Sequence, residues 1–297
     1  MTENEFLLID RLNAIKDTIN KYGEENFYLS FSGGKDSTVV HYLLDMALPG
    51  NKISRVFCDT GIEYNAIRSF VRGFNDERFI IIYPKKNIRE TLQNVGYPFK
   101  SKEHSQRVFE YQRNRDLLRE GSYLYDYVYG TGKKENSNFC CPKALRYQFT
   151  DQFDLKISHF CCNELKKKPF KKYEEETGRS ICITGMMRSE GGQRTHINCL
   201  LTRNGKVIKF HPLAKVDGDW ENWFINEYNI KLCDLYYPPY NFERTGCKGC
   251  PFGVTPDQLE SMDEAERKQC ETIWKPVYDE YRRIGYRLTN EQQMKLF

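Results

Sequence analysis

The sequence predicts an α/β protein with a doubly wound, mostly parallel sheet and a helical C-terminal segment. Short apolar strands alternate with amphipathic helices, and a glycine-rich turn joins the first strand to a helix. Residues 79–83 (FIIIY) are apolar throughout, as the strands of parallel sheets are. We therefore expect one α/β domain over residues 1–235. Residues 236–297, a cysteine-containing turn followed by a long helix, are expected to pack on it.

The expected elements follow from the spacing of apolar residues and from the residues, such as proline and glycine, that end helices and strands. Apolar side chains recur at near-helical spacing from Phe6 to Ile19, which predicts a helix over residues 3–21. A helix beginning at Ser37 is expected to end at Leu48, before Pro49. The stretch 96–172 is polar and helical in pattern. The other expected elements are strands over residues 27–31, 53–58, 79–83 and 180–184, and helices over residues 63–73 and 260–284.

Composition excludes several classes of protein. The chain has 297 residues, and 14% aromatic residues argue against disorder. No run of 18 apolar residues predicts a membrane-spanning helix, and the first residues do not resemble a secretory signal. We therefore expect a cytoplasmic protein without a membrane partner. The net charge of +4 permits a nucleotide or nucleic-acid partner but does not require one.

The most informative local motif is Ser32-Gly33-Gly34-Lys35-Asp36-Ser37-Thr38, which follows a strand and opens a helix. Its glycines let the backbone approach an anion without an obstructing Cβ atom. A helix start presents N–H groups and partial positive charge, to which Lys35 adds an ammonium and the three hydroxyls add donors. Ser-Gly-Gly alone is also an ordinary turn, and aspartate and serine are ordinary caps. The complete motif favours phosphate binding, although it has neither Walker nor GxGxxG spacing.

This loop resembles the pyrophosphate-binding loop of the ATP pyrophosphatase (PP-loop) superfamily, whose members form adenylyl intermediates or act on adenylylated sulfur compounds. Residues 57–63 (FCDTGIE), 183–190 (ITGMMRSE) and 210–213 (FHPL) are similar, in the same order, to segments of phosphoadenosine phosphosulfate (PAPS) reductase-like proteins. The resemblance covers about residues 27–252. It implies an adenine nucleotide alpha-hydrolase-like fold that binds ATP, or a related adenine nucleotide, with Mg2+.

Four residues outside the loop are expected to complete the nucleotide site. Asp59 ends a strand at the edge where open α/β sheets bind ligands, and we expect it to contact the nucleotide or a metal ion. Gly185 and Arg188 follow a later strand at the same edge, and Arg188 and Arg194 can clamp a phosphate or sulfate bidentately. A capping aspartate and surface arginines are the alternative interpretation. The expected catalytic residues are Lys35, Asp36, Asp59 and Arg188.

The eleven cysteines include two adjacent pairs and one CxxC motif. In a reducing compartment thiols are expected rather than disulfides, and four thiolates suit zinc or an iron–sulfur cluster. A CxxC motif alone can also be a redox pair. The family resemblance implies a [4Fe-4S] cluster on a Cys-Cys pair and a CxxC motif, and 84 residues separate Cys162 from Cys247. The expected ligands are Cys161, Cys162, Cys247 and Cys250, with Zn2+ as the alternative metal and Cys140-Cys141 as the alternative pair. We expect Cys58 and Cys182, which lie in apolar strands, to be core residues.

Two departures from the sulfonucleotide reductases bear on activity. Those enzymes usually lose the Lys-Asp-Ser end of the loop, which this chain keeps, and they carry a nucleophilic cysteine in a C-terminal tail, whereas no cysteine follows Cys270 here. The resemblance therefore implies an ATP-dependent adenylating enzyme or sulfurtransferase that releases pyrophosphate. The alternatives are a sulfonucleotide reductase, a protein like the small subunit of sulfate adenylyltransferase, and a non-catalytic nucleotide sensor or nucleic-acid binder.

The sequence does not name the acceptor, the sulfur donor or the oligomeric state. We expect the acceptor to be a nucleic acid or a small sulfur compound. A lysine run beside Cys162 is either a solvated helix face or a surface that attracts a polyanion. It consists of Lys166, Lys167, Lys168, Lys171 and Lys172.

Overall fold

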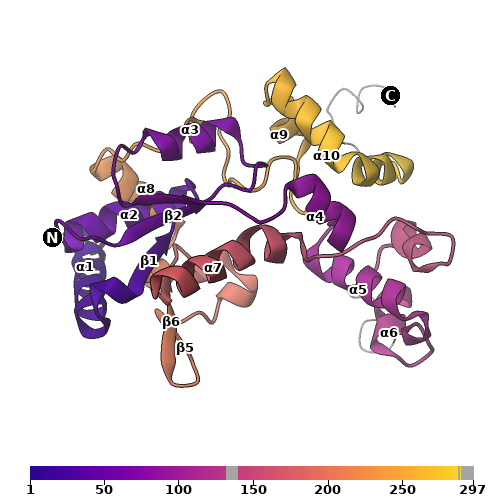
Figure 1. Cartoon of the computed structure of the whole chain (residues 1–297), viewed down its shortest axis with the longest axis horizontal. Coiled ribbons are helices and arrows are strands. Elements are labelled where there is room, and N and C mark those ends of the chain that lie inside the picture. Colours follow the sequence, from indigo (N-terminus) through magenta and orange to yellow (C-terminus); the bar gives the residue numbers. More distant parts are fainter. Residues whose placement is uncertain (132–139, 287, 289–297) are drawn as a thin grey trace. The chain divides into compact units, whose positions relative to one another are not determined.

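The computed structural model describes residues 1–131, 140–286 and 288 (Figure 1). The chain divides into two compact units. The sheet unit comprises residues 1–59, 63–84 and 168–245, and the helical unit comprises residues 60–62, 85–167 and 246–297. This division differs from the single boundary expected near residue 235, because segments from both sides of that boundary pack together. Within the helical unit, for example, the ring centroids of Phe99 and Tyr281 lie 4.6 Å apart.

A six-stranded sheet forms the centre of the sheet unit, with the strand order β3-β2-β1-β4-β6-β5. Only β5 runs antiparallel, so the predicted mostly parallel sheet is confirmed. The β5–β6 hairpin was not expected, although its Asn204-Gly205 turn, with both residues at positive φ, is a strong hairpin signal. The strands are β1 (Phe27–Ser30), β2 (Ser54–Cys58), β3 (Phe79–Ile82), β4 (Ile181–Ile183), β5 (Leu200–Arg203) and β6 (Lys206–Phe210).

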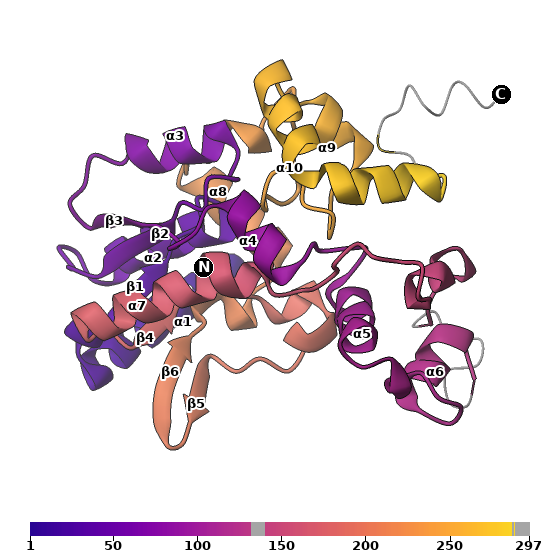
Figure 2. The ribbon, with the colours of Figure 1, turned by 45° about the vertical axis from the view of Figure 1, so that its right-hand side comes forward.

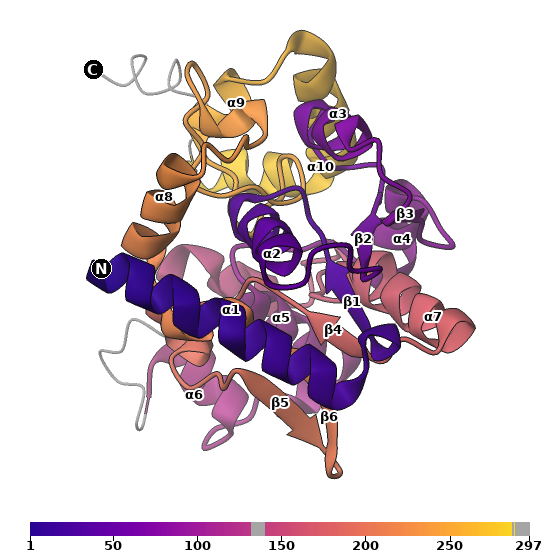
Figure 3. The same cartoon turned by 90° about the vertical axis from the view of Figure 1, so that its left-hand side faces the viewer.

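Helices cover the sheet on both faces because alternate strand residues point in opposite directions. Tyr28 of β1 packs on one side with Tyr173 of α7 (Lys168–Thr177), in a cluster that includes Cys182. Phe31, three residues further along, meets His41 of α2 (Lys35–Ala47) with ring centroids 6.2 Å apart. Figure 2 shows α7 lying along the sheet, and Figure 3 shows α1 (Glu3–Tyr22) beside α2. Cys58 and Cys182 are buried, as predicted.

The sheet unit departs from the expected elements in two places. Helix α2 begins at Lys35, two residues before the expected start, so the phosphate loop runs directly into it. Strand β3 is an edge strand, and Ile80 is 36% exposed, because only β2 pairs with it. An apolar run therefore did not distinguish an edge strand from a central one. The other helices of this unit are α3 (Asn65–Gly73) and α8 (Gly218–Glu227).

The helical unit confirms the helical pattern predicted for much of residues 96–172. The helix expected over residues 260–284 is present over Glu264–Arg283, and it begins four residues later than expected because Asp263 accepts the N–H of Glu266 and caps it. Among the described residues, no helix is long and apolar enough to cross a membrane. The unit contains α4 (Ile88–Val95), α5 (Lys102–Arg113), α6 (Tyr123–Tyr129), α9 (Pro256–Glu260) and α10 (Glu264–Arg283).

Candidate functional site

The phosphate loop is shaped by its own hydroxyl groups. The Ser32 N–H donates to Ser37 Oγ at 3.2 Å, and the Gly34 N–H donates to Ser32 Oγ at 3.2 Å. Gly33 adopts a φ of 71°, which side chains with a Cβ atom rarely tolerate. The Thr38 hydroxyl donates a hydrogen bond to the Gly34 carbonyl, which stabilises the first turn of α2. The loop thus turns sharply between β1 and α2, as the motif predicted.

A segment far along the chain closes over this loop. Tyr236 Oη accepts the Lys35 N–H at 3.0 Å and lies 3.0 Å from Thr245 Oγ1. A Cβ atom on Gly34 would lie 3.1 to 3.2 Å from the Ser32, Thr245 and Tyr236 oxygens, so glycine allows this close approach. Sequence reasoning missed Tyr236 and Thr245, because no spacing rule connects them to a loop about two hundred residues away.

The loop opens into a polar cavity of about 160 Å³ within the sheet unit. Arg194 lines this cavity as expected, and it is paired with Glu190. Arg244, which sequence reasoning missed, also pairs with Glu190, at 2.5 Å. Two guanidinium groups therefore lie beside the loop, where they can bind phosphate oxygens bidentately. The cavity is lined by Ser32, Gly34, Lys35, Asp36, Glu190, Arg194, Tyr236, Glu243, Arg244 and Thr245.

Two of the expected nucleotide contacts have other partners. The Arg188 Nε donates to the Ile197 carbonyl at 2.6 Å, and Arg188 is exposed. The buried Asp59 Oδ2 pairs with Arg68 at 3.0 Å and Arg72 at 3.2 Å. Neither Arg188 nor Asp59 is among the described residues that line the cavity. Their roles toward a nucleotide stay predictions.

Gly185 is placed against the phosphate loop, as its position after β4 predicted. A Cβ atom there would lie 2.7 Å from Asp36 Cβ and 2.8 Å from the Asp36 backbone carbonyl. Asp36 is itself half-buried. Burial raises the pKa of its carboxyl, and the Glu190 carboxylate raises it further. The end of β4 and the start of α2 are thus in direct contact, with no room for a side chain between them.

The Lys35 side chain is held by α8. Its Nζ lies 3.1 Å from Glu221 Oε2 and 3.4 Å from Asn222 Oδ1. Glu221 is completely buried, and that burial, followed by the Asp36 carboxylate, raises its pKa to about 7. Sequence reasoning missed Glu221, because an acidic residue in a helix carries no sign of burial.

The four expected ligand cysteines all lie in the helical unit. Cys161 and Cys162 begin a helical run that continues as a π turn over Asn163–Lys167, a feature frequent at functional sites. The hydrogen bond that the Cys161 thiol donates to Cys162, then burial, raises the pKa of Cys161, and the Cys250 and Cys247 sulfurs act in the same direction. The four sulfurs are therefore near enough to influence one another.

Helix α10 holds the CxxC turn in place. Three of its aromatic side chains donate to the carbonyls of Lys248, Gly249 and Pro251 at 2.6 to 2.9 Å. Lys248, between the two cysteines, is buried and pairs with Glu266 at 2.9 Å. A turn whose carbonyls and charge are all satisfied by buried partners is rigid. The aromatic donors are Trp274, Tyr278 and Tyr281.

The donor chemistry of this centre fits a thiophilic metal or cluster. Within the described ranges, however, no three His, Cys, Asp or Glu side chains already have the arrangement of a metal site. The alternative pair has different surroundings, because burial raises the pKa of Cys141 to about 12 and the charged groups acting on it are Lys100, Arg146 and Cys140. These surroundings favour Cys161 and Cys162 as the partners of the CxxC motif.

The lysine run divides into two parts. Lys171 and Lys172 pair with glutamates one turn further along α7 and are exposed, which is typical of a solvated helix face. Hydrogen bonding from Cys161 holds the pKa of Cys162 below its ordinary value, and Lys102, Lys166 and Lys167 lower it further. The charges that bear on the cysteine centre are thus the first lysines of the run.

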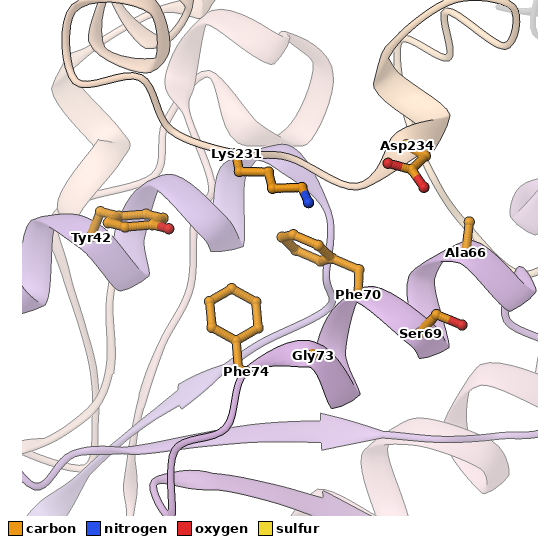
Figure 4. Close-up of a pocket in the computed structure, with 8 residues that line it drawn as sticks. All are labelled: Tyr42, Ala66, Ser69, Phe70, Gly73, Phe74, Lys231 and Asp234. Carbon is orange, nitrogen blue, oxygen red and sulfur yellow. The ribbon is translucent and has the colours of Figure 1, made fainter.

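A second cavity, of about 350 Å³, lies away from the loop, beside α2, α3 and residues 231–234 (Figure 4). Its walls include three aromatic side chains, Tyr42, Phe70 and Phe74, and two charged ones, Lys231 and Asp234. None of the site residues expected from the sequence is among the described residues that line it. The expected residues that line a cavity therefore line the polar cavity at the phosphate loop.

The sheet order and the loop after β1 define an α/β protein of the PP-loop, adenine nucleotide alpha-hydrolase-like class. Residues 26–252 match the family model described as phosphoadenosine phosphosulfate reductase domain. The chain belongs to this PAPS reductase-like family, whose members bind adenine nucleotides and are enzymes of the PP-loop type. The resemblance drawn from the sequence is confirmed.

Curated proteins with similar sequences match only part of this chain. A GMP synthase (glutamine-hydrolysing) of Prochlorococcus marinus is 31% identical over 131 residues, which are 40% of this chain and 25% of that protein. The chain spans about a quarter of the length of the curated relatives it matches.

Solved structures give distant matches. The PAPS reductase of Candida auris, in a phosphate complex, is 14% identical with a TM-score of 0.41, over 80% of this chain and 93% of that one. The U34-tRNA thiolase NcsA of Methanococcus maripaludis, with its [4Fe-4S] cluster, is 15% identical with a TM-score of 0.41, over 96% of this chain and 80% of that one.

Proposed function

We propose that this protein is an ATP-dependent adenylating enzyme or sulfurtransferase that releases pyrophosphate. The observation that carries the proposal is the polar cavity at the phosphate loop, where Arg194 and Arg244 line the same space as Lys35. Three cationic side chains beside a helix start suit a polyanion such as the β- and γ-phosphates of ATP. A substrate that placed a single phosphate at the loop would need fewer cationic side chains there.

In the proposed reaction Mg2+ enters with ATP as part of the substrate. The acceptor oxygen attacks the α-phosphorus, the bond from that phosphorus to the bridging oxygen breaks, and pyrophosphate leaves. Lys35 and the arginines stabilise the negative charge that develops on the leaving group. A sulfur donor then displaces AMP from the adenylylated acceptor.

The buried state of Cys270 supports this reaction over sulfonucleotide reduction. Its side chain is completely buried, packs on Met262 and Gly249, and has its pKa raised to about 12 by burial. A buried thiol with a raised pKa supplies little thiolate and is a poor nucleophile. Cys270 is therefore unsuited to attack a sulfonucleotide.

We further propose that Cys161, Cys162, Cys247 and Cys250 hold a [4Fe-4S] cluster, with Zn2+ as the alternative. The adjacent pair, the CxxC turn and the mutual influence of the four sulfurs support this assignment. When bound, such a cluster would supply iron that can bind a sulfur donor. The chain's own contribution is the CxxC turn, which α10 holds in one conformation.

The test of the proposed reaction is product analysis. Protein purified without oxygen is incubated with Mg2+, ATP and candidate acceptors, either nucleic acids or small sulfur compounds, and separately with adenylyl sulfate or PAPS and a thiol. We expect pyrophosphate from the first mixture, with AMP released only when a sulfur donor such as sulfide is added, and no sulfite from the second. Sulfite release without pyrophosphate would establish the reductase instead, and nucleotide binding without any product would indicate a sensor or nucleic-acid binder.

A further inference from the structure

The contact between Lys35 and Glu221 joins the phosphate loop to a completely buried carboxylate. Glu221 lies on α8 and its Oε2 forms an ion pair with Lys35 Nζ at 3.1 Å, and neither carboxylate oxygen has a hydrogen-bond partner among the described residues. After burial, the largest influence on its pKa is the charge of Asp36, also on α2, which repels the Glu221 charge, and Lys35 acts in the opposite direction. Glu190 and Arg244 act in turn on Asp36. The ammonium of Lys35 is thus the group that stabilises a charged Glu221.

A nucleotide phosphate would compete for the same ammonium. If Lys35 turns to a phosphate oxygen, Glu221 is left buried beside Asp36 without a counter-ion. A buried and unpaired carboxylate is costly, and the group takes up a proton instead. Breaking a buried ion pair therefore requires a proton to replace the cation that leaves.

We propose that Glu221 is a positioning residue which holds Lys35 at the phosphate loop before nucleotide binding and exchanges it for a proton when the nucleotide arrives. This inference rests on the proposed function, since it requires a nucleotide with phosphates on residues 32–38. The chemical class of ligand is a nucleoside triphosphate. The exchange links nucleotide affinity to pH through a residue that does not itself touch the ligand.

The direction of the linkage follows from the two states. Without nucleotide the pKa of Glu221 is about 7, so the carboxyl is mostly ionised at pH 8 and mostly protonated at pH 6. In the complex the pKa lies higher, because the ammonium has left. Binding at pH 8 then takes up close to one proton, and binding at pH 6 takes up few. Affinity falls as the pH rises above 7, by up to about tenfold per pH unit.

Isothermal titration with α,β-methylene-ATP and Mg2+ tests this, since the analogue cannot release pyrophosphate. Titrations at pH 8 in HEPES, Tricine and Tris, buffers of different ionisation enthalpy, give the number of protons taken up. We expect close to one for the wild type and close to none for Glu221→Gln. Glu227→Gln, an exposed glutamate at the end of the same helix, is the matched control and should behave as the wild type.

Lys35→Met provides a second variant that keeps Glu221 in place. Without the ammonium, Glu221 is already protonated before binding, so we expect no proton uptake in this variant either. Equal uptake by the wild type and Glu221→Gln, or wild-type binding without uptake at pH 8, would overturn the inference and leave the proposed function intact. Failure of the wild type to bind the analogue would overturn the proposed function, and this inference with it.

Discussion

Gly185→Ala is expected to lower the affinity for Mg2+ and ATP by at least about tenfold, which is about 1.4 kcal/mol. The new Cβ atom would lie 2.7 to 2.8 Å from Asp36 Cβ and from the Asp36 backbone carbonyl. Backbone atoms cannot avoid the new Cβ atom by a change of rotamer, as a flexible side chain can. The start of α2 must therefore move. The phosphate loop moves with it, and overpacking of this kind costs about 1–3 kcal/mol of stability. Isothermal titration with ATP, together with circular dichroism, measures both effects.

Gly73→Ala is the matched control for this substitution. Gly73 ends α3, and a Cβ atom there meets no other atom within 4 Å. We expect unchanged ATP affinity and unchanged or slightly increased stability, since alanine is favoured over glycine in helices. If Gly185→Ala bound ATP as tightly as Gly73→Ala, the close contact of β4 with the phosphate loop would not shape the binding site.

Cys247→Ser is expected to abolish cluster binding. Protein purified without oxygen should contain about four iron and four sulfide ions per chain and show broad visible absorption. The variant should lose most of the iron and all of the colour, because serine does not replace a thiolate as a ligand of a soft metal. Iron and sulfide analysis with an absorption spectrum checks this outcome.

Three further variants sharpen the cluster test. Cys199→Ser changes a half-buried cysteine of the sheet unit and should leave the iron content unchanged. Cys140→Ser tests the alternative pair and should also retain the cluster, whereas Cys161→Ser should lose it. A colourless wild-type protein that contains zinc would show that the four cysteines bind Zn2+ and not an iron–sulfur cluster. Loss of iron in Cys140→Ser, with iron retained in Cys161→Ser, would show that the alternative pair supplies the ligands.

Much of the sheet unit could be predicted from local patterns. The first three strands and the loop before α2 are continuous in sequence, and apolar runs, glycines and the helix start signal them directly. The β5–β6 hairpin carried an Asn-Gly signal that was not used. The position of β3 at the edge could not be foreseen, because strand order depends on packing between distant segments and not on the composition of one strand.

The candidate site was predictable where its residues are local. Residues 32–38, Gly185 and Arg194 were named from motifs, and the structure places all of them at or beside the polar cavity. Tyr236, Arg244 and Glu221 were missed, because each reaches the loop through folding of the chain. Arg188 followed the same motif as Gly185, yet it bonds to a nearby carbonyl and faces solvent. A motif thus fixes the backbone better than it fixes the direction of a long side chain.

The central claim is that residues 32–38 bind the β- and γ-phosphates of ATP. The most direct test compares the affinities of ATP and AMP, both with Mg2+, by isothermal titration at pH 7. We expect ATP to bind at least about tenfold more tightly, a difference of about 1.4 kcal/mol, because AMP leaves the loop and the arginines without their ligands. Equal affinities for ATP and AMP, or tighter binding of adenylyl sulfate than of ATP, would contradict it.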